Sequence, residues 1–431
     1  MAPVSTTPSH LLLLPAPPSA ISNKSLDAAY RPSLAAVLEQ IASSIRNEST
    51  GAHLDIALPF PYLLQHKEKA RGQLYTPTQR LVAGVYKLIC VLAAKQGINV
   101  EDESGIDARV ILVACPRGYD DSSVEDIAFG PVVSIRQLAS CQRPWQSLFV
   151  VEGADGEKLL RQFSSHHDPR APVRRVPGGA IKVEERASSH AASSAKAVTA
   201  VAVRHSSIAV GGTWDHIHIG HKLLLTMFAF MLEPPLTRHP HGSSSSGRSL
   251  TIGITGDELL VNKKFADALQ DWPARQRSTV DFLRAIMDFH TPLPLGASAE
   301  ADHVQLTSLS QPWPNGHAVH VRLGDVLLLK CVRISDPFGP TITDESISAL
   351  VLSGETRSGG QAVNQKRIER GWPALEVFEV DVLDADESAG ADDAKTGGVP
   401  QADVAASFVS KLSSTSIRKA LSEKTRIKSK A

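Results

Sequence analysis

The second half of the chain alternates short apolar segments with longer amphipathic ones, and this order constrains the fold more than any other feature. Strands are predicted at 207–214, 249–255, 325–334, 349–353 and 375–383, and helices at 220–232, 273–290, 359–371 and 413–424. Strands that alternate with helices are joined by right-handed crossovers and form a parallel sheet. The sequence therefore predicts an α/β fold with a Rossmann-like doubly wound sheet, whose ligands bind beyond the carboxyl ends of the strands.

The length of 431 residues exceeds one ordinary core and indicates at least two domains. Residues 1–163 contain buried-type strands and predict a smaller N-terminal α/β domain, in which no catalytic constellation and no role are evident. The Ser-, Ala- and Pro-rich stretch 164–203 predicts a flexible linker. Residues 204–431 form the second domain, which two low-complexity insertions interrupt near 238–249 and 384–407.

Charge and cysteine content exclude several classes of protein. Lys plus Arg equals Asp plus Glu at 45 each, so no overall basic field exists to recruit nucleic acid or a membrane surface, and neither is an expected partner. The four cysteines include no CxxC, which argues against a zinc ribbon or a disulfide framework. The N-terminus lacks the features of a signal peptide or a membrane span. We expect a cytoplasmic location, with the nucleus as the alternative.

Three histidines lie close together in VGGTWDHIHIGHKLLL, where the first strand of the main sheet passes into the first helix. Gly212 allows a tight turn, and Gly220 leaves room for a ligand at the helix N-terminus, where free N–H groups favour phosphate. His218 and His221 are three residues apart, so both would point the same way and donate hydrogen bonds to phosphate. Two alternatives stay open. One is a zinc site, although HxxH lacks the glutamate of HExxH, and the other is a polar loop without a ligand.

Five separate stretches between residues 207 and 422 resemble one enzyme family. TWDHIHIGH is similar to the T-x-D-x-x-H-x-G-H motif of the nucleotidyltransferase superfamily, and LSSTSIR is similar to its partner motif ISSTxxR. The intervening NKKFADALQDWPARQRSTVDFL, DPFGPTITD and LSGETRSGGQAVNQKR resemble the eukaryotic type of phosphopantetheine adenylyltransferase, in the same order. The N-terminal region is similar in layout to the accessory region of fungal members. The sequence departs from the family pattern at Trp214, usually Phe, and at Ile219, usually a small polar residue.

The resemblance implies a monofunctional pantetheine-phosphate adenylyltransferase. Such an enzyme transfers AMP from ATP to 4′-phosphopantetheine and gives dephospho-coenzyme A and pyrophosphate. Its partners would be these two substrates and other enzymes of coenzyme A synthesis, with Mg²⁺ bound through ATP and no metal bound by the protein itself. No P-loop motif follows the last predicted helix, so a fused dephospho-coenzyme A kinase is not expected.

The resemblance also implies roles for individual residues. His218 and His221 would contact the ATP phosphates, with His221 on the α-phosphate, and Lys264, or else Lys263, would bridge the two substrates. Arg275 would hold the phosphate of phosphopantetheine. The other candidates would contact the nucleotide, its phosphates or the incoming phosphate: Gly212, Thr213, Gly220, Glu355, Thr356, Arg357, Ser414, Thr415 and Arg418.

Three other functions fit parts of the same pattern. HIGH and KLSST also resemble motifs of class I aminoacyl-tRNA synthetases, but no anticodon-reading region follows and the balanced charge suits tRNA poorly. A cytidylyltransferase would be expected to show RTEGIST where this chain has LSSTSIR. The third is a non-catalytic scaffold of a coenzyme A-synthesising complex, and the presence of both imidazoles, the lysines and Arg418 argues against it.

Overall fold

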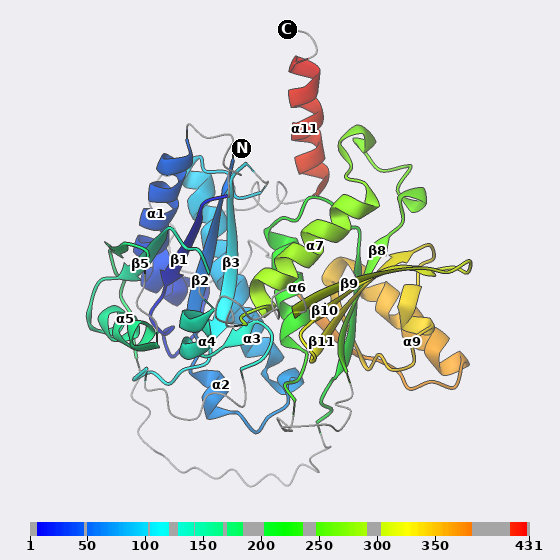
Figure 1. The fold of residues 1–431 in the computed structure, drawn as a ribbon, viewed down its shortest axis with the longest axis horizontal. Coiled ribbons are helices and arrows are strands. Elements are labelled where there is room, and N and C mark those ends of the chain that lie inside the picture. Colours follow the sequence, from blue (N-terminus) through cyan, green and yellow to red (C-terminus); the bar gives the residue numbers. More distant parts are fainter. Residues whose placement is uncertain are drawn as a thin grey trace, which may run out of the picture.

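The computed structural model describes residues 7–46, 50–101, 104–119, 128–141, 143–166, 170–183, 202–235, 247–290, 303–381 and 414–428. These residues form two α/β units, each built on its own sheet (Figure 1). No helix within these ranges combines the length and the apolar character that a bilayer crossing requires.

The first unit contains a six-stranded sheet in the order β4-β3-β2-β1-β5-β6, in which every pair is parallel. Its strands are β1 (Ser9–Leu13), β2 (Ala52–Pro59), β3 (Ile106–Val113), β4 (Val132–Val133), β5 (Ser147–Val151) and β6 (Val173–Val176). Its helices are α1 (Asn23–Ile45), α2 (Tyr62–Gln65), α3 (Arg71–Gln96), α4 (Ile135–Ser140) and α5 (Ala154–His166). Apolar side chains are buried on both faces of the central strands, with α1 and α3 on one face and α4 and α5 on the other.

The first unit extends beyond the predicted boundary at residue 163. Helix α5 continues to His166, and Val173–Val176, predicted as part of the flexible linker, forms strand β6 beside β5. The Ala180 N–H then donates to the Ala28 carbonyl of α1 over 2.9 Å, which ties the chain to this unit. Residues 184–201 of the predicted linker lie outside the described residues, as do the insertion near 384–407 and residues 238–246 of the other insertion. The end of that insertion is not a loop, because Arg248 and Ser249 belong to a strand.

The second unit contains a seven-stranded sheet in the order β13-β12-β7-β8-β11-β10-β9. Five of these strands are parallel to one another: β7 (Ser207–Gly212), β8 (Arg248–Thr255), β11 (Leu327–Ile334), β12 (Ala349–Ser353) and β13 (Glu376–Val380). The chain builds outward from β7 through β8 to β11, and then crosses to the other side for β12 and β13. The strand order therefore reverses between β7 and β12, which confirms the predicted doubly wound α/β fold.

An antiparallel hairpin extends this sheet, so the sheet is not parallel throughout. Strand β9 (Val304–Ser310) pairs with β10 (His317–Leu323), and β10 pairs with β11, each in antiparallel register. The sequence predicted a strand only from residue 325. Along β9 most side chains are partly or fully exposed, which suits a strand at the edge of an antiparallel addition.

Helices cover both faces of the parallel part of this sheet (Figure 1). α6 (Ile219–Phe230) and α7 (Trp272–Met287) lie on the face that meets the first unit, and α9 (Arg357–Glu369) packs on the other. The closing helix α11 spans Ser414–Lys428. Short 3-10 turns complete the unit: η1 (Asp257–Leu259), η2 (Ala266–Ala268), η3 (Gly339–Ile342) and η4 (Gly354–Thr356).

Helix α6 is buried on nearly all sides because it packs between the two units. Every residue of it is buried except Gly220 and His221. It contacts α3 of the first unit on one side and β7 and β12 on the other, and one hydrophobic cluster runs through both units. A helix that is apolar all round is expected only where its whole surface is covered.

Polar contacts join the two units at both ends of α6. Near its start, Lys222 Nζ lies 2.7 Å from Asp107 Oδ1 of β3. Just beyond its end, Glu233 accepts a hydrogen bond from the backbone N–H of Arg71, whose guanidinium donates to the Phe230 carbonyl over 3.0 Å. The first unit therefore holds the helix whose first turn carries the imidazoles.

We expect Asp107→Asn to lower the free energy of unfolding by about 1–3 kcal/mol, because it leaves the buried Lys222 ammonium and the neighbouring Arg109 guanidinium without their anion. The value lies below the full cost of breaking a buried pair because the Asp107 side chain is 29% exposed. Urea unfolding measures the change. As the control, Asp27→Asn removes a more exposed pair, with Arg31 one turn along α1, and should cost less than about 1 kcal/mol. Equal midpoints for the two variants would contradict a stabilising role of the Asp107 ion pairs.

Candidate active site

The predicted site residues gather at the carboxyl edge of the second sheet. β7 ends at Gly212 and β8 at Thr255, and the Thr255 hydroxyl donates to the Gly212 carbonyl over 3.1 Å. The chain then passes from β7 directly into α6. On the other side of β7 the strand order reverses, and β12 ends at Ser353. This edge is where doubly wound sheets bind their ligands.

Glycine and tryptophan determine the shape of the turn between β7 and α6. Trp214 (φ 57°) and His216 (φ 49°) adopt the left-handed backbone conformation, which is uncommon outside glycine. The Trp214 side chain is fully buried, and its Nε1–H donates to the Gly253 carbonyl over 3.0 Å. A Cβ at Gly212 would lie 2.8 Å from the indole ring, so a larger residue would displace it. The tryptophan that departs from the family pattern is therefore anchored by its own N–H.

His218 and His221 lie side by side at the start of α6. His218 is the N-cap residue, and its ring centroid is 3.9 Å from that of His221, with 23° between the ring planes. The Trp214 ring packs against His221 at 5.3 Å. Within the described part of the chain, the buried Nδ1 atom of each imidazole has no hydrogen-bond partner. Two buried polar nitrogens without partners are a feature expected where a ligand binds.

Burial keeps both imidazoles neutral. Desolvation lowers the pKa of His218 well below its ordinary value, and the neighbouring His221 and Lys222 lower it further. Desolvation also lowers the pKa of His221 to about 4, against a hydrogen bond with the His216 backbone that raises it. A neutral imidazole has one N–H donor and one acceptor nitrogen. The pair can therefore donate hydrogen bonds to phosphate oxygens near pH 7 without bringing positive charge.

A buried ion pair joins the imidazole turn to the closing helix. Asp215 is fully buried, and its Oδ2 lies 2.5 Å from Nη1 of Arg418. Arg418 also donates from Nε to the Lys264 carbonyl (3.0 Å) and from Nη2 to the Thr415 hydroxyl (3.1 Å). In Figure 1, α11 projects from the body of the second unit. The structure thus brings together the two motifs that the resemblance pairs.

The loop after β8 holds the same turn from another side. Asp215 Oδ1 accepts from the Gln270 backbone N–H over 3.0 Å, and the Gln270 side chain accepts from the His216 backbone N–H over 2.9 Å. His216 Nε2 lies 2.8 Å from the Ala268 carbonyl, so the third histidine has a structural role. The sequence prediction named neither Asp215 nor Gln270 as a site residue. The signal for Asp215 was present, because it is the aspartate of the T-x-D-x-x-H-x-G-H motif.

Four further predicted residues lie around this ion pair. Lys263 and Lys264 follow η1 with exposed side chains, and the Lys264 backbone is held by Arg418. Ser414 and Thr415 form the first turn of α11, half-buried and exposed respectively. These ammonium and hydroxyl groups are accessible to a bound phosphate.

Glu355, Thr356 and Arg357 lie at the carboxyl end of β12, where η4 passes into α9. The Thr356 hydroxyl donates to the Ser353 carbonyl over 3.0 Å. Arg357 pairs with Glu379 of β13 at 2.5 Å, so its guanidinium points toward β13. These residues flank the point where the strand order reverses, on the side opposite β8.

Arg275, predicted to hold the phosphate of phosphopantetheine, contacts only protein groups among the described residues. Its side chain is fully buried, and all three guanidinium nitrogens contact protein groups. Nη2 pairs with Asp257 at 2.5 Å, Nη1 donates to the Thr213 carbonyl over 2.6 Å, and Nε donates to the Gln270 carbonyl over 3.0 Å. In this arrangement the guanidinium holds the imidazole turn in place.

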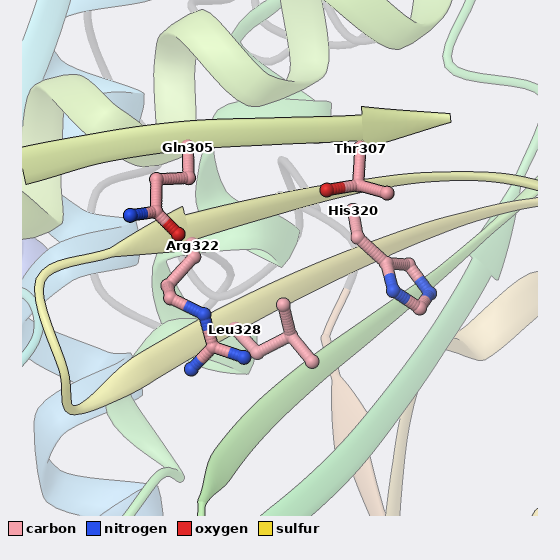
Figure 2. A pocket seen from close by; sticks show the side chains of 5 residues that line it. All are labelled: Gln305, Thr307, His320, Arg322 and Leu328. Atoms are coloured by element: carbon pink, nitrogen blue, oxygen red, sulfur yellow. The ribbon is translucent and has the colours of Figure 1, made fainter. Parts of the chain in front are cut away.

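A pocket on the antiparallel hairpin is separate from this turn. Figure 2 shows its lining side chains, which come from β9, β10 and β11: Gln305, Thr307, His320, Arg322 and Leu328. The pocket lies on the strands themselves and contains none of the predicted site residues. We assign it no part in nucleotide binding.

The N-terminal part of the chain matches a family without an assigned activity. Residues 1–182 match the model described as "Domain of unknown function (DUF8446)", and this range ends shortly after β6. Among full-chain comparisons, which are not limited to this part, an uncharacterized protein of Schizosaccharomyces pombe is 31% identical over 175 residues, which cover 41% of this chain and 39% of that protein.

Several other relatives are named phosphopantetheine adenylyltransferase, and two of them serve as examples. The protein of Saccharomyces cerevisiae is 30% identical over 213 residues, which cover 49% of this chain and 48% of the relative. The protein of Methanothermobacter thermautotrophicus is 27% identical over 184 residues, which cover 43% of this chain and 78% of the relative. The chain therefore spans less than half the length of the two yeast proteins that it matches.

Proposed function

We propose that the chain is a phosphopantetheine adenylyltransferase, which transfers AMP from ATP to 4′-phosphopantetheine. The main support is the Asp215–Arg418 ion pair, which holds the imidazole turn and the start of α11 together at the carboxyl edge of the sheet. Two segments that each resemble one half of a nucleotidyltransferase motif are thus in contact through buried groups. The names of the relatives from Saccharomyces cerevisiae and Methanothermobacter thermautotrophicus favour the same reaction.

This reaction needs no nucleophile from the protein. An oxygen of the acceptor phosphate attacks the α-phosphorus of ATP, the bond from that phosphorus to the bridging oxygen breaks, and pyrophosphate leaves with the electron pair. Catalysis then depends on positioning and on stabilising the charge of the transferring group. The site offers the groups for this purpose: hydrogen-bond donors at a helix start, exposed ammonium groups and hydroxyls.

Each group has a defined place in this scheme. His218 and His221 would donate to the ATP phosphates from the start of α6, where the helix dipole also favours negative charge. Lys264 would neutralise the transferring group. Ser414 and Thr415 would donate to the β- and γ-phosphates from the start of α11.

Mg²⁺ would arrive on ATP and offset part of the triphosphate charge. Asp215, the carboxylate of the imidazole turn, does not suit a Mg²⁺ ligand because it is fully buried and paired with Arg418. We therefore place the ion on phosphate oxygens. Because the Arg275 guanidinium is already bound to Thr213 and Asp257, we assign the acceptor phosphate to Lys263, whose side chain is exposed.

Pyrophosphate release with different acceptors tests the proposal. We expect release from ATP and Mg²⁺ with 4′-phosphopantetheine, and none with phosphocholine, nicotinamide mononucleotide or free amino acids. CTP in place of ATP is the control for a cytidylyltransferase. ATP binding without pyrophosphate release with any acceptor would overturn the proposal and favour a non-catalytic scaffold.

A further inference from the structure

We propose a second ligand site, for a divalent transition-metal ion and zinc in the first instance, formed by Asp288, His290 and His303. One ligand atom from each of these residues lies within 4.8 Å of the other two. The site follows the C-terminal end of α7, whereas Arg275 lies near its start. The 16 residues of α7 span about 24 Å, so the metal site is separate from the imidazole turn.

Both imidazoles are directed at the same carboxylate oxygen. His290 Nδ1 and His303 Nε2 each lie 2.9 Å from Asp288 Oδ1. The two rings are stacked at 3.7 Å between centroids, with 29° between their planes. In tetrahedral zinc sites, bonds of about 2.0–2.1 Å place neighbouring ligand atoms about 3.3 Å apart. Small side-chain rotations would therefore bring the three ligand atoms to one ion.

The donor set and its exposure fit such an ion. Two imidazole nitrogens and one carboxylate oxygen are typical ligands of zinc and other divalent first-row metals, and they leave a coordination position for water. The Asp288 side chain is 10% exposed, while those of His303 and His290 are 23% and 42% exposed. The Asp288 carboxylate is thus shielded from water, and a metal ion can reach it past the more exposed histidines.

Two arginines near the cluster do not neutralise the ligand oxygen. Arg284 approaches the other carboxylate oxygen, Oδ2, at 4.0 Å and is itself 41% exposed. Arg143 donates to the Asp288 backbone carbonyl over 2.9 Å and is paired with Asp55 of β2 at 3.1 Å. Because Arg143 and Asp55 belong to the first unit, an ion at this cluster would also fix the end of α7 where the two units meet. Metal binding should therefore raise the stability of the chain.

Titration of the full chain, freed of tags and treated with a chelator, tests the site. We expect one equivalent of Co²⁺ to bind with visible absorption, Zn²⁺ to displace it, and Zn²⁺ to raise the melting temperature. His303→Ala should weaken binding by at least about 100-fold, because a lost ligand costs more than the 10–100-fold of a lost supporting group. The same variant should show no rise in melting temperature.

Two control variants separate this site from the other histidines. His320→Ala removes an imidazole from β10 outside the cluster, and His221→Ala removes one from the imidazole turn, so both should retain the ion. Loss of binding in His221→Ala, or equal affinity in wild type and His303→Ala, would overturn the proposal. If circular dichroism shows that His303→Ala is unfolded, the more exposed His290→Ala replaces it. Neither readout depends on adenylyl transfer, so this test is independent of the proposed activity.

Discussion

Replacing Arg418 with methionine is expected to detach α11 from the edge of the sheet and to lower kcat/KM at least about 100-fold. Breaking a buried ion pair costs about 3–5 kcal/mol, and each 1.4 kcal/mol corresponds to about a tenfold change. Among the described residues, the other buried side chains of α11 are Ile417 and Ser422, so Arg418 makes the one buried ion pair of this helix that the structure describes. Hydrogen exchange of residues 414–428 and steady-state kinetics measure the two effects.

Lys419→Met is the matched control, because it removes the same charge from the next residue, whose side chain is exposed. It should leave the exchange of α11 unchanged. Asp215→Asn should act like Arg418→Met, and the double variant should lose little more than either single one, since both changes break one contact. Independent, additive losses would contradict a shared ion pair. Unchanged hydrogen exchange of residues 414–428 in Arg418→Met would also contradict the role of this ion pair.

Replacing His221 with alanine is expected to lower kcat by about 10² to 10³, the usual loss when a donor aimed at developing negative charge is removed. The KM for ATP should change less, because His218 and the first turn of α11 remain in place. Steady-state kinetics with ATP and 4′-phosphopantetheine measure both constants, and His320→Ala, on the separate pocket, is the control. Turnover of His221→Ala within a few-fold of wild type would contradict the role of this imidazole.

The low pKa of His221 also predicts how the reaction rate and the stability of the fold depend on pH. With a pKa of about 4 in the folded chain, the imidazole stays neutral between pH 6 and 8, and its titration should not change the rate there. In the unfolded chain the pKa of this imidazole is its ordinary value, 6.5. Between pH 6.5 and about 4 the unfolded state therefore binds more protons than the folded state, and the free energy of unfolding decreases as the pH falls through this range. His221→Ala should lessen this loss. A rate change between pH 6 and 8 that disappears in His221→Ala would contradict a neutral imidazole.

The parallel part of the second sheet, and the place of the imidazole turn at its carboxyl edge, could be predicted from the sequence. Alternating strands and helices leave few topologies, and the strand-to-helix turn at Gly212 had to lie at a carboxyl edge. The burial of α6 on all sides also had a signal, because Leu223 to Leu232 offer no polar face apart from Thr226. A helix without a polar face requires cover on both sides. Here the first unit supplies that cover.

The remaining features depend on distant contacts that no local pattern reveals. Arg275 was expected to bind a phosphate, yet its burial commits the guanidinium to Asp257 and Thr213. Likewise, neutral histidines follow from desolvation, which depends on what the fold places around them. His303 lies fifteen positions after Asp288, so the cluster of Asp288, His290 and His303 could not be predicted from spacing. Residues in charged networks are therefore the ones for which sequence reasoning succeeds least.

Mass spectrometry of the product formed from ATP, Mg²⁺ and 4′-phosphopantetheine shows whether the chain transfers AMP to this acceptor. We expect a new species in which AMP is joined to the acceptor's phosphate, with one pyrophosphate released for each molecule formed. Arg418→Met should give far less of this species. Folded wild-type chain that binds ATP but gives no such species would contradict adenylyl transfer at the joined imidazole turn and α11.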